Sequence, residues 1–111
     1  MLIALGDIYA QIVHREEVRS LMRSTQEQVR AEPGCDIFSF AEVVDDPGHF
    51  VIVQQWRDRA ALDAHYRSDP FRAYQAGIAP YLARESELLV HEVSSTVRPV
   101  DSSVINSPGD D

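Results

Sequence analysis

Two side chains in the middle of the chain are the residue types that proton removal from an aromatic compound needs. Trp56 stands near the end of an apolar segment, and His65 follows nine residues later on a segment with helical spacing. An imidazole, with its usual pKa of about 6.5, takes the proton of a phenol at neutral pH, and an indole offers a flat apolar face and one donor. If the two segments pack face to face, both side chains line one pocket. Each also has a structural interpretation, Trp56 as a core aromatic and His65 as a histidine bonded to a carbonyl.

Five other residues are candidates for substrate binding. Asp7 interrupts an apolar side of the first predicted strand, where it is either exposed or buried as a secondary base. Gln54 shares the strand parity of Trp56, and it either bonds a substrate carbonyl or is a simple polar sheet residue. Three aromatic residues on the following helical segments either shape a cavity or close it as a plain core: Tyr66, Phe71 and Tyr74.

The remaining residues that could carry chemistry show no recognised spacing. The other histidines, His14, His49 and His91, form no HxH or HExxH pattern, and Cys35 is the only cysteine, so no metal site is predicted. No Gly-rich phosphate loop, no GxSxG motif and no Cys–His arrangement is present, and we expect no cofactor. Cys35 is expected to be buried and inert.

The composition restricts the possible partners. A chain of 111 residues supports one domain, and its net charge of −8 argues against binding to nucleic acid or to an anionic membrane. No apolar run reaches the roughly 18 residues of a membrane helix, and the N-terminus lacks the pattern of a signal peptide. A single cysteine forms no intrachain disulfide. We therefore expect a soluble, reduced, cytoplasmic protein.

The hydrophobic periodicity predicts the element order βαββαβ. Alternating or doubly apolar segments predict strands over 2–11, 35–44, 49–56 and 85–93. Helical spacing predicts helices over 16–31, 59–67 and 68–82, with Asp58 as a cap and a kink near Pro80. This order is typical of an α+β, ferredoxin-like fold, in which helices cover one face of a four-stranded antiparallel sheet.

The second face of the predicted sheet is also apolar. The strands at both 2–11 and 49–56 carry apolar residues on both parities, and a single layer of helices covers only one of their faces. We therefore predict a homodimer formed through the open sheet face. Residues 1–95 make up the predicted domain, and the polar segment 96–111 is expected to be a C-terminal arm packed on the partner subunit.

Three segments carry a resemblance to a known family. They are AEPGC (31–35), DDPGHFVIVQQW (45–56) and ALDAHYRSDPFRAY (61–74). Their order, together with the element order over residues 2–93, resembles the antibiotic biosynthesis monooxygenase superfamily of dimeric α+β barrels. The resemblance implies a pocket between sheet and helices in each subunit, with Trp56 as a wall that stacks on a flat substrate and His65 among the pocket residues.

The resemblance implies several possible activities, because the fold alone does not select one. Members of the superfamily oxidise polycyclic phenols to quinones without flavin or metal, degrade haem, or act on quinols or small signalling molecules. The haem-degrading pattern needs an Asn in the first strand, a Trp on the short helix and an axial His on the next helix. This chain has Gly6 or Asp7, His65, and Tyr74 or Gln75 at those places, so haem degradation is not expected.

The sequence therefore predicts a cofactor-independent monooxygenase or quinol-oxidising enzyme, which acts on a flat hydroxylated aromatic compound with molecular oxygen. His65 would be the base or hydrogen-bonding group, because a deprotonated phenol can pass an electron to oxygen directly. A small-molecule binding or isomerising dimer without oxygenase activity is the alternative. A dimer whose pocket is filled by aromatic side chains is a third interpretation.

Overall fold

The computed structural model describes residues 1–99, whose elements follow the predicted order. The strands are β1 (Leu2–Tyr9), β2 (Cys35–Glu42), β3 (His49–Trp56) and β4 (Glu87–Glu92). The helices are α1 (Arg15–Val29), α2 (Arg59–Tyr66) and α3 (Asp69–Ile78), with 3-10 turns η1 (Ile12–His14) and η2 (Ala79–Tyr81). The predicted helix over 68–82 ends earlier, because Pro80 has no N–H to continue the α-helical bonding. Of the predicted C-terminal arm, residues 100–111 lie outside the described residues.

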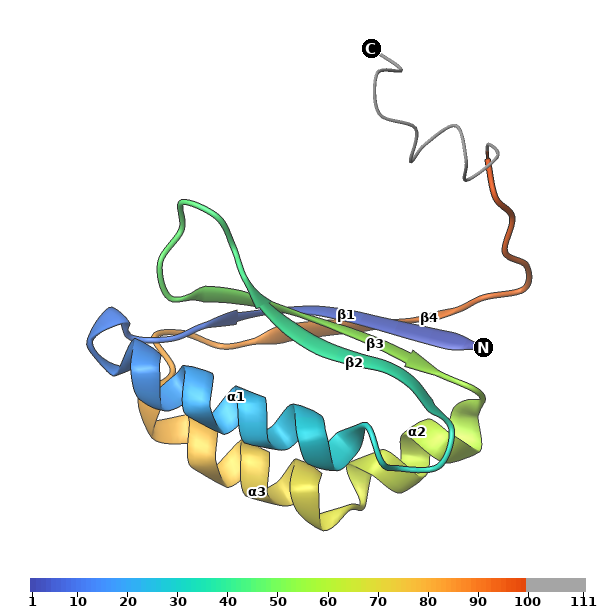
Figure 1. Ribbon diagram of the computed structural model, residues 1–111, viewed down its shortest axis with the longest axis horizontal. Helices are drawn as coiled ribbons and strands as arrows, with labels where there is room; N and C mark the ends of the chain where they lie inside the picture. Colours follow the sequence, from blue (N-terminus) through green and yellow to red (C-terminus); the bar gives the residue numbers. More distant parts are fainter. Residues whose placement is uncertain (100–111) are drawn as a thin grey trace.

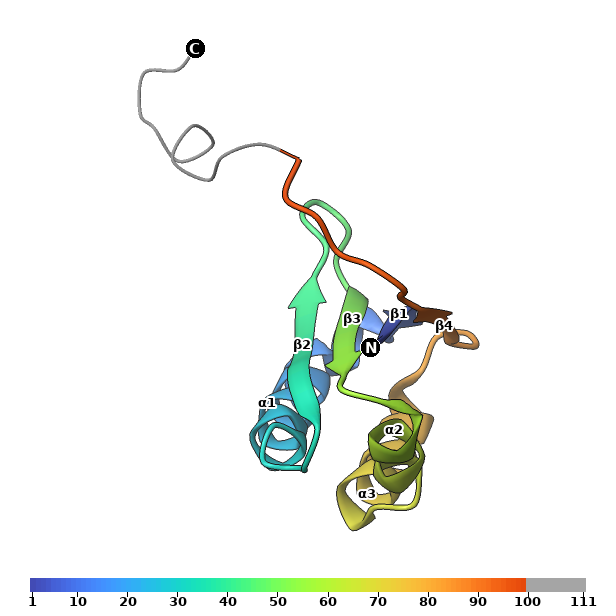
Figure 2. The ribbon, with the colours of Figure 1, turned by 90° about the vertical axis from the view of Figure 1, so that its right-hand side faces the viewer.

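The four strands form one antiparallel sheet in the order β2-β3-β1-β4. All three α-helices lie on the same side of this sheet, with α1 below β2 and with α2 and α3 on the side of β4 (Figures 1 and 2). The arrangement confirms the ferredoxin-like fold. It also places β1 and β3 at the centre of the sheet, where they form the roof over the space between the helices.

The hydrophobic core lies between the sheet and the helices. The even-numbered residues of β1 and β3 face the helices, because successive strand side chains point to opposite faces. α1 contributes Val18, Met22 and Val29, and all three are buried. Full burial of such a side chain stabilises the fold by about 1.5–3 kcal/mol. Gln54 and His65 are the polar exceptions in this layer, together with Thr25.

Two side-chain caps fix where α2 and α3 begin. The carboxylate of Asp58 accepts a hydrogen bond from the backbone N–H of Ala61 at 2.9 Å, as predicted. The hydroxyl of Ser68 accepts one from the N–H of Phe71 at 3.3 Å, and Pro70 lies in the first turn of α3. These caps separate two short helices that would otherwise run together, and each helix presents its aromatic side chains to the sheet.

A glycine turn joins the end of α1 to the start of β2. Gly34 has a φ of +79°, and a Cβ at this position would lie 2.5 Å from the Cβ of Ala61 on α2. Only glycine fits such a backbone without strain or collision. The carbonyl of Gly34 accepts a bond from the N–H of Arg57 at 2.8 Å. The turn therefore holds Glu32 close to α2, although the two are distant in sequence.

The sheet face opposite the helices is apolar and open. Leu5, Ile37, Val53 and Leu89 are exposed there, and Leu89 retains 66% of its accessible surface. The strand register places Leu5 between Val53 and Leu89, so these side chains form a continuous strip across three strands. Within residues 1–99, no helix combines the length and apolar composition that a membrane span requires.

Candidate active site

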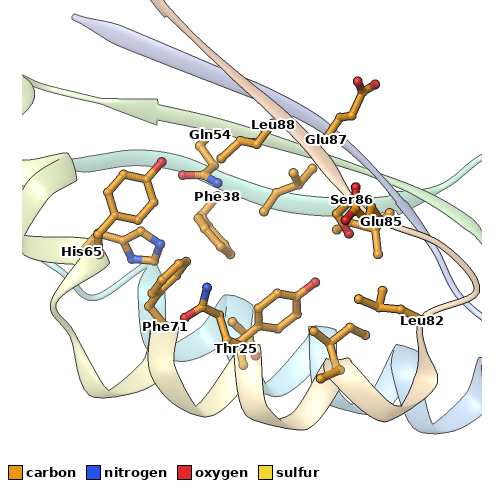
Figure 3. Close-up of a pocket in the computed structure, with 17 residues that line it drawn as sticks. Thr25, Phe38, Gln54, His65, Phe71, Leu82, Glu85, Ser86, Glu87 and Leu88 are labelled. Carbon is orange, nitrogen blue, oxygen red and sulfur yellow. The ribbon is translucent and has the colours of Figure 1, made fainter.

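A cavity of about 520 Å³ lies between the sheet and the helices. Strand residues Ile8, Phe38, Ile52 and Gln54 form its roof, and Thr25 of α1 lies on the opposite side. Figure 3 shows Phe38, Gln54, His65, Phe71 and Thr25 arranged around this common space. The remaining lining residues come mainly from α2, α3 and the segment that leads into β4: Tyr66, Tyr74, Gln75, Ile78, Ala79, Leu82, Glu85, Ser86, Glu87 and Leu88.

His65 lies at the α2 end of the cavity and is only 2% exposed. Its Nδ1 is 3.0 Å from Oε1 of Glu32. A carboxylate only accepts hydrogen bonds, so the neutral ring carries its hydrogen on Nδ1 and keeps a free lone pair on Nε2. Burial lowers the pKa of His65, and the bond to Glu32 opposes this shift. The ring is therefore a neutral base near pH 7.

Aromatic side chains surround the imidazole of His65. The ring centroid of Trp56 lies 4.8 Å away, and the rings of Phe71 and Phe38 lie 5.2 and 5.5 Å away. Tyr66, the next residue on α2, has its ring centroid at 5.7 Å. These contacts restrict the ring to one orientation. They also exclude water from its faces, which is the physical cause of the lowered pKa.

Trp56 is fully buried and lies behind His65, outside the set of residues that line the cavity. Its indole Nε1 donates a 2.9 Å hydrogen bond to Oε1 of Gln54. Of the two interpretations of Trp56, the structure matches the core aromatic more closely than the stacking wall. The residue supports the site indirectly, through the orientation of Gln54 and the position of His65.

Gln54 presents its amide nitrogen to the cavity. An indole N–H can only donate, so the oxygen of the amide faces Trp56 and its NH₂ group faces the other way. Figure 3 shows the amide at the roof of the cavity with its nitrogen toward the open space. This group can donate a hydrogen bond to a carbonyl or phenolate oxygen of a bound molecule.

Tyr66, Phe71 and Tyr74 line the cavity and leave it open, contrary to the interpretation of a closed pocket. Burial raises the pKa of both tyrosines, that of Tyr74 most strongly. Both phenols therefore stay protonated at neutral pH. Tyr74 also packs against Phe40 of β2, with ring centroids 5.4 Å apart.

The exposed end of the cavity lies at the segment before β4 and at the first residues of β4. Glu85, Ser86, Glu87 and Leu88 line it and are exposed. The carboxylate of Glu87 points away from the cavity in Figure 3, in agreement with its register position opposite Asp7. Sequence reasoning treated this segment only as part of a strand and did not connect it with the site.

Asp7 lies on the open sheet face, away from the cavity. Its Oδ1 is 2.7 Å from Nε2 of His49, whose Nδ1 is 2.8 Å from Oδ2 of Asp46. The bond to Asp7, followed by the contacts with Asp46, raises the pKa of His49. The structure thus separates Asp7 from the six other candidate residues. Cys35, predicted to be buried, is half-buried, and burial raises its pKa.

Glu32 is the residue of this site that sequence reasoning missed. It belongs to the AEPGC segment, which marks the end of a helix, and 33 positions separate it from His65. A carboxylate next to a turn gives no sign of a distant partner. The sequence did contain a signal for the turn itself, because Pro33 and Gly34 restrict the backbone there. It contained no signal for which residue the turn brings next to Glu32.

Within residues 1–99, no group of three or more His, Cys, Asp or Glu side chains is arranged to hold a metal ion. The polar residues that line the cavity carry an imidazole, two amides and four hydroxyls: His65, Gln54, Gln75, Thr25, Tyr66, Tyr74 and Ser86. Glu85 and Glu87 add carboxylates at its exposed end. This set can take a proton from a ligand and donate hydrogen bonds to it.

Comparison with known proteins places these features in a family context. The chain is 30% identical over 95 residues to the uncharacterised protein sll1783 of Synechocystis, across 86% of this chain and 65% of that protein. It thus spans less than two thirds of that relative's length. It is also 31% identical over 81 residues to Rv0793 of Mycobacterium tuberculosis, a protein provisionally named a monooxygenase, across 69% of this chain and 79% of the relative.

Solved structures show the same fold. The structure of Rv0793 superimposes with a TM-score of 0.79 at 25% identity, over 87% of this chain and 98% of that chain. A Deinococcus radiodurans protein, provisionally described as an antibiotic biosynthesis monooxygenase, gives a TM-score of 0.85 at 21% identity, over 91% and 100% of the two chains. The antibiotic biosynthesis monooxygenase family itself matches residues 1–77, which include β1 to β3, Glu32, Gln54 and His65. The chain therefore belongs to the antibiotic biosynthesis monooxygenase family.

Proposed function

We propose that the protein is a cofactor-independent oxygenase that converts a flat hydroxylated aromatic compound to a quinone with molecular oxygen. The observation that carries this proposal is the state of His65. Glu32 holds its Nδ1–H, burial keeps the ring neutral, and the ring belongs to the wall of an apolar cavity. A neutral imidazole in that position is a suitable base for a phenolic or benzylic proton.

The chemistry balances without a further reductant. His65 removes one proton from the substrate, and the resulting anion passes one electron to O₂. The substrate radical and superoxide then combine to a peroxide. The proton returns to this peroxide, and loss of water leaves a new carbonyl, so one oxygen atom enters the product and the other leaves as water. Gln54 stabilises the anion by donating to its oxygen, because preorganised donors favour developing charge.

The dimensions of the cavity favour a fused-ring substrate. Its volume of about 520 Å³ lies within the range of about 300–1,000 Å³ that is usual for small-molecule sites. The aromatic side chains of Phe38, Phe71 and Tyr74 offer faces and edges for ring stacking. The exposed end of the cavity includes Glu85, and the net charge is −8, so neutral substrates are favoured over anionic ones.

The open sheet face supports a homodimer as part of this proposal. Leu5, Val53 and Leu89 form an exposed apolar strip, and exposed strips of this kind are typical of protein–protein contacts. A second copy would cover the strip sheet to sheet. The cavity lies on the opposite side of the sheet, so each subunit keeps its own site.

Oxygen uptake tests the proposal. Purified, metal-stripped protein is mixed with anthrone, 1,4-dihydroxynaphthalene and smaller hydroquinones, and oxygen consumption and products are followed. A monooxygenase uses one O₂ per quinone, incorporates one atom of ¹⁸O₂ and releases no hydrogen peroxide. Quinol oxidation instead releases one hydrogen peroxide per quinone. Saturable binding of the same compounds without oxygen uptake would contradict both reactions and favour the binding or isomerising dimer.

A further inference from the structure

Glu32 lies between two separate cavities. His65 lines the substrate cavity, whereas Glu32 lines a second cavity of about 430 Å³ on the outer side of α2. No residue lines both cavities. The 3.0 Å contact between Nδ1 of His65 and Oε1 of Glu32 therefore connects the interior of the site to a different surface of the protein.

The second cavity is polar at its edge and open to water. The side chains of Arg57 and Asp58 line it and are 66% and 53% exposed. The side chain of Glu32 is 17% exposed, compared with 2% for His65. Its Oε1 contacts the imidazole, and Oε2 lies 3.5 Å from the hydroxyl of Ser68, which lines the same cavity. Glu32 thus contacts the buried ring with one oxygen and reaches a solvent-facing cavity.

We propose that Glu32 is a proton relay, which carries the substrate proton from His65 to water on the outer side of α2. The proposal rests on the proposed function of His65 as the base. Nε2 takes the substrate proton, Nδ1 gives its hydrogen to Oε1 of Glu32, and Glu32 releases a proton to water in the second cavity. The same steps in reverse return one proton to the peroxide, so no proton is gained or lost over the turnover.

The relay would give the proton on the buried His65 ring a route to solvent while a substrate is bound. A bound flat substrate covers Nε2 and separates it from the exposed end of the cavity near β4. An imidazolium enclosed by Trp56, Phe38 and Phe71 is disfavoured by desolvation, so a proton held there would return to the substrate. An exit through Glu32 leaves the ring neutral and gives the substrate anion time to meet oxygen.

Proton release without oxygen tests the relay directly. Anthrone is mixed anaerobically with protein in excess in weak buffer that contains a pH-indicator dye, and the absorbance of the bound anion is followed at the same time. In the wild type, about one proton should appear in solution for each anion formed. Glu32→Gln cannot take up a proton, so the proton stays on the imidazole. This variant should form less anion, and proton release per anion should fall at least tenfold.

The control variant is Glu27→Gln, which removes the same charge from the exposed surface of α1. It should release protons like the wild type. Anion formation without proton release in the wild type, or equal proton release per anion in Glu32→Gln and wild type, would overturn the relay and leave the oxygenase proposal intact. Failure of the wild type to form the anion would instead count against the proposed function.

A second measurement reports the protonation of the ring itself. The ¹⁵N chemical shifts of His65 are recorded by NMR for the anaerobic complex with the bound anion. The relay predicts a neutral ring with its hydrogen on Nε2 in the wild type and a doubly protonated ring in Glu32→Gln. A doubly protonated ring in the wild-type complex would contradict the relay.

Discussion

The indole Nε1 of Trp56 donates a 2.9 Å hydrogen bond to the amide Oε1 of Gln54, two residues earlier on the same face of β3. Both side chains are buried, so the bond is shielded from competing water. Because Trp56 holds the oxygen, the amide nitrogen is directed toward the cavity. Trp56 thus positions the side chains of Gln54 and His65, both of which line the cavity.

Trp56→Phe keeps an aromatic ring but removes the donor. We expect a loss of about 1–3 kcal/mol in the free energy of unfolding, because the buried amide oxygen of Gln54 then lacks a partner. Gln54→Leu removes the acceptor, and in that background Trp56→Phe should cost clearly less. Urea denaturation of the four proteins measures this coupling. Strictly additive losses would show that the hydrogen bond contributes nothing to stability.

The protonation of His65 predicts the acid side of the pH–rate profile. Burial lowers its pKa, so the ring stays neutral and active as a base at pH values somewhat below the usual 6.5. Activity should therefore persist through pH 6.5 and fall only under more acidic conditions. The profile of kcat/KM, together with an NMR titration of His65, checks this. A limb that begins above pH 6.5 would contradict the assignment.

The contacts of His49 predict that the free energy of unfolding decreases as the pH rises. Asp7 and Asp46 raise its pKa, so folding favours the protonated ring. The stabilisation is fully present below the unfolded pKa of about 6.5 and is lost as the pH rises through the higher folded value. The difference in stability between wild type and His49→Asn should be larger at pH 5.5 than at pH 9. Asp7→Asn should reduce this pH dependence, and a difference that grows with pH would be inconsistent with the contacts.

Leu89→Glu tests the open sheet face as a dimer contact. The side chain is 66% exposed in the subunit, so a charge there has little effect on the subunit fold but is buried in a sheet-to-sheet dimer. We expect the wild type to sediment as a dimer and Leu89→Glu as a monomer. Ala76→Glu, on the exposed surface of α3, is the control and should remain dimeric. A monomeric wild type would refute the predicted contact.

The elements and their order were predictable because local signals agree with the fold. The period of the apolar residues, the Asp58 cap and the positive-φ glycines at Gly34 and Gly48 mark the boundaries of the elements. The end of α3 was less predictable, since the helical spacing of apolar residues continues to Leu82 while the helix ends at Ile78. Pro80 decides that boundary, and propensity alone sets it only approximately.

The site was predictable only where neighbouring residues share a helix or strand face. His65, Tyr66, Phe71, Tyr74 and Gln54 line the cavity because strand parity and helical spacing turn them inward. Partners from distant segments do not follow from such patterns. Glu32 reaches His65 through the turn after α1, and Asp7 finds His49 across the β1–β3 register. Both contacts depend on tertiary geometry.

The most direct test of the account compares oxygen uptake by the wild type and His65→Ala, with the substrate that the wild type uses fastest. If His65 is the base, kcat of the variant should be lower by about 10²–10⁴-fold, which is the usual contribution of one positioned acid–base group. Imidazole added to the buffer should then restore part of the rate, since the alanine leaves space beside Glu32. A variant that consumes oxygen at the wild-type rate would contradict the central claim.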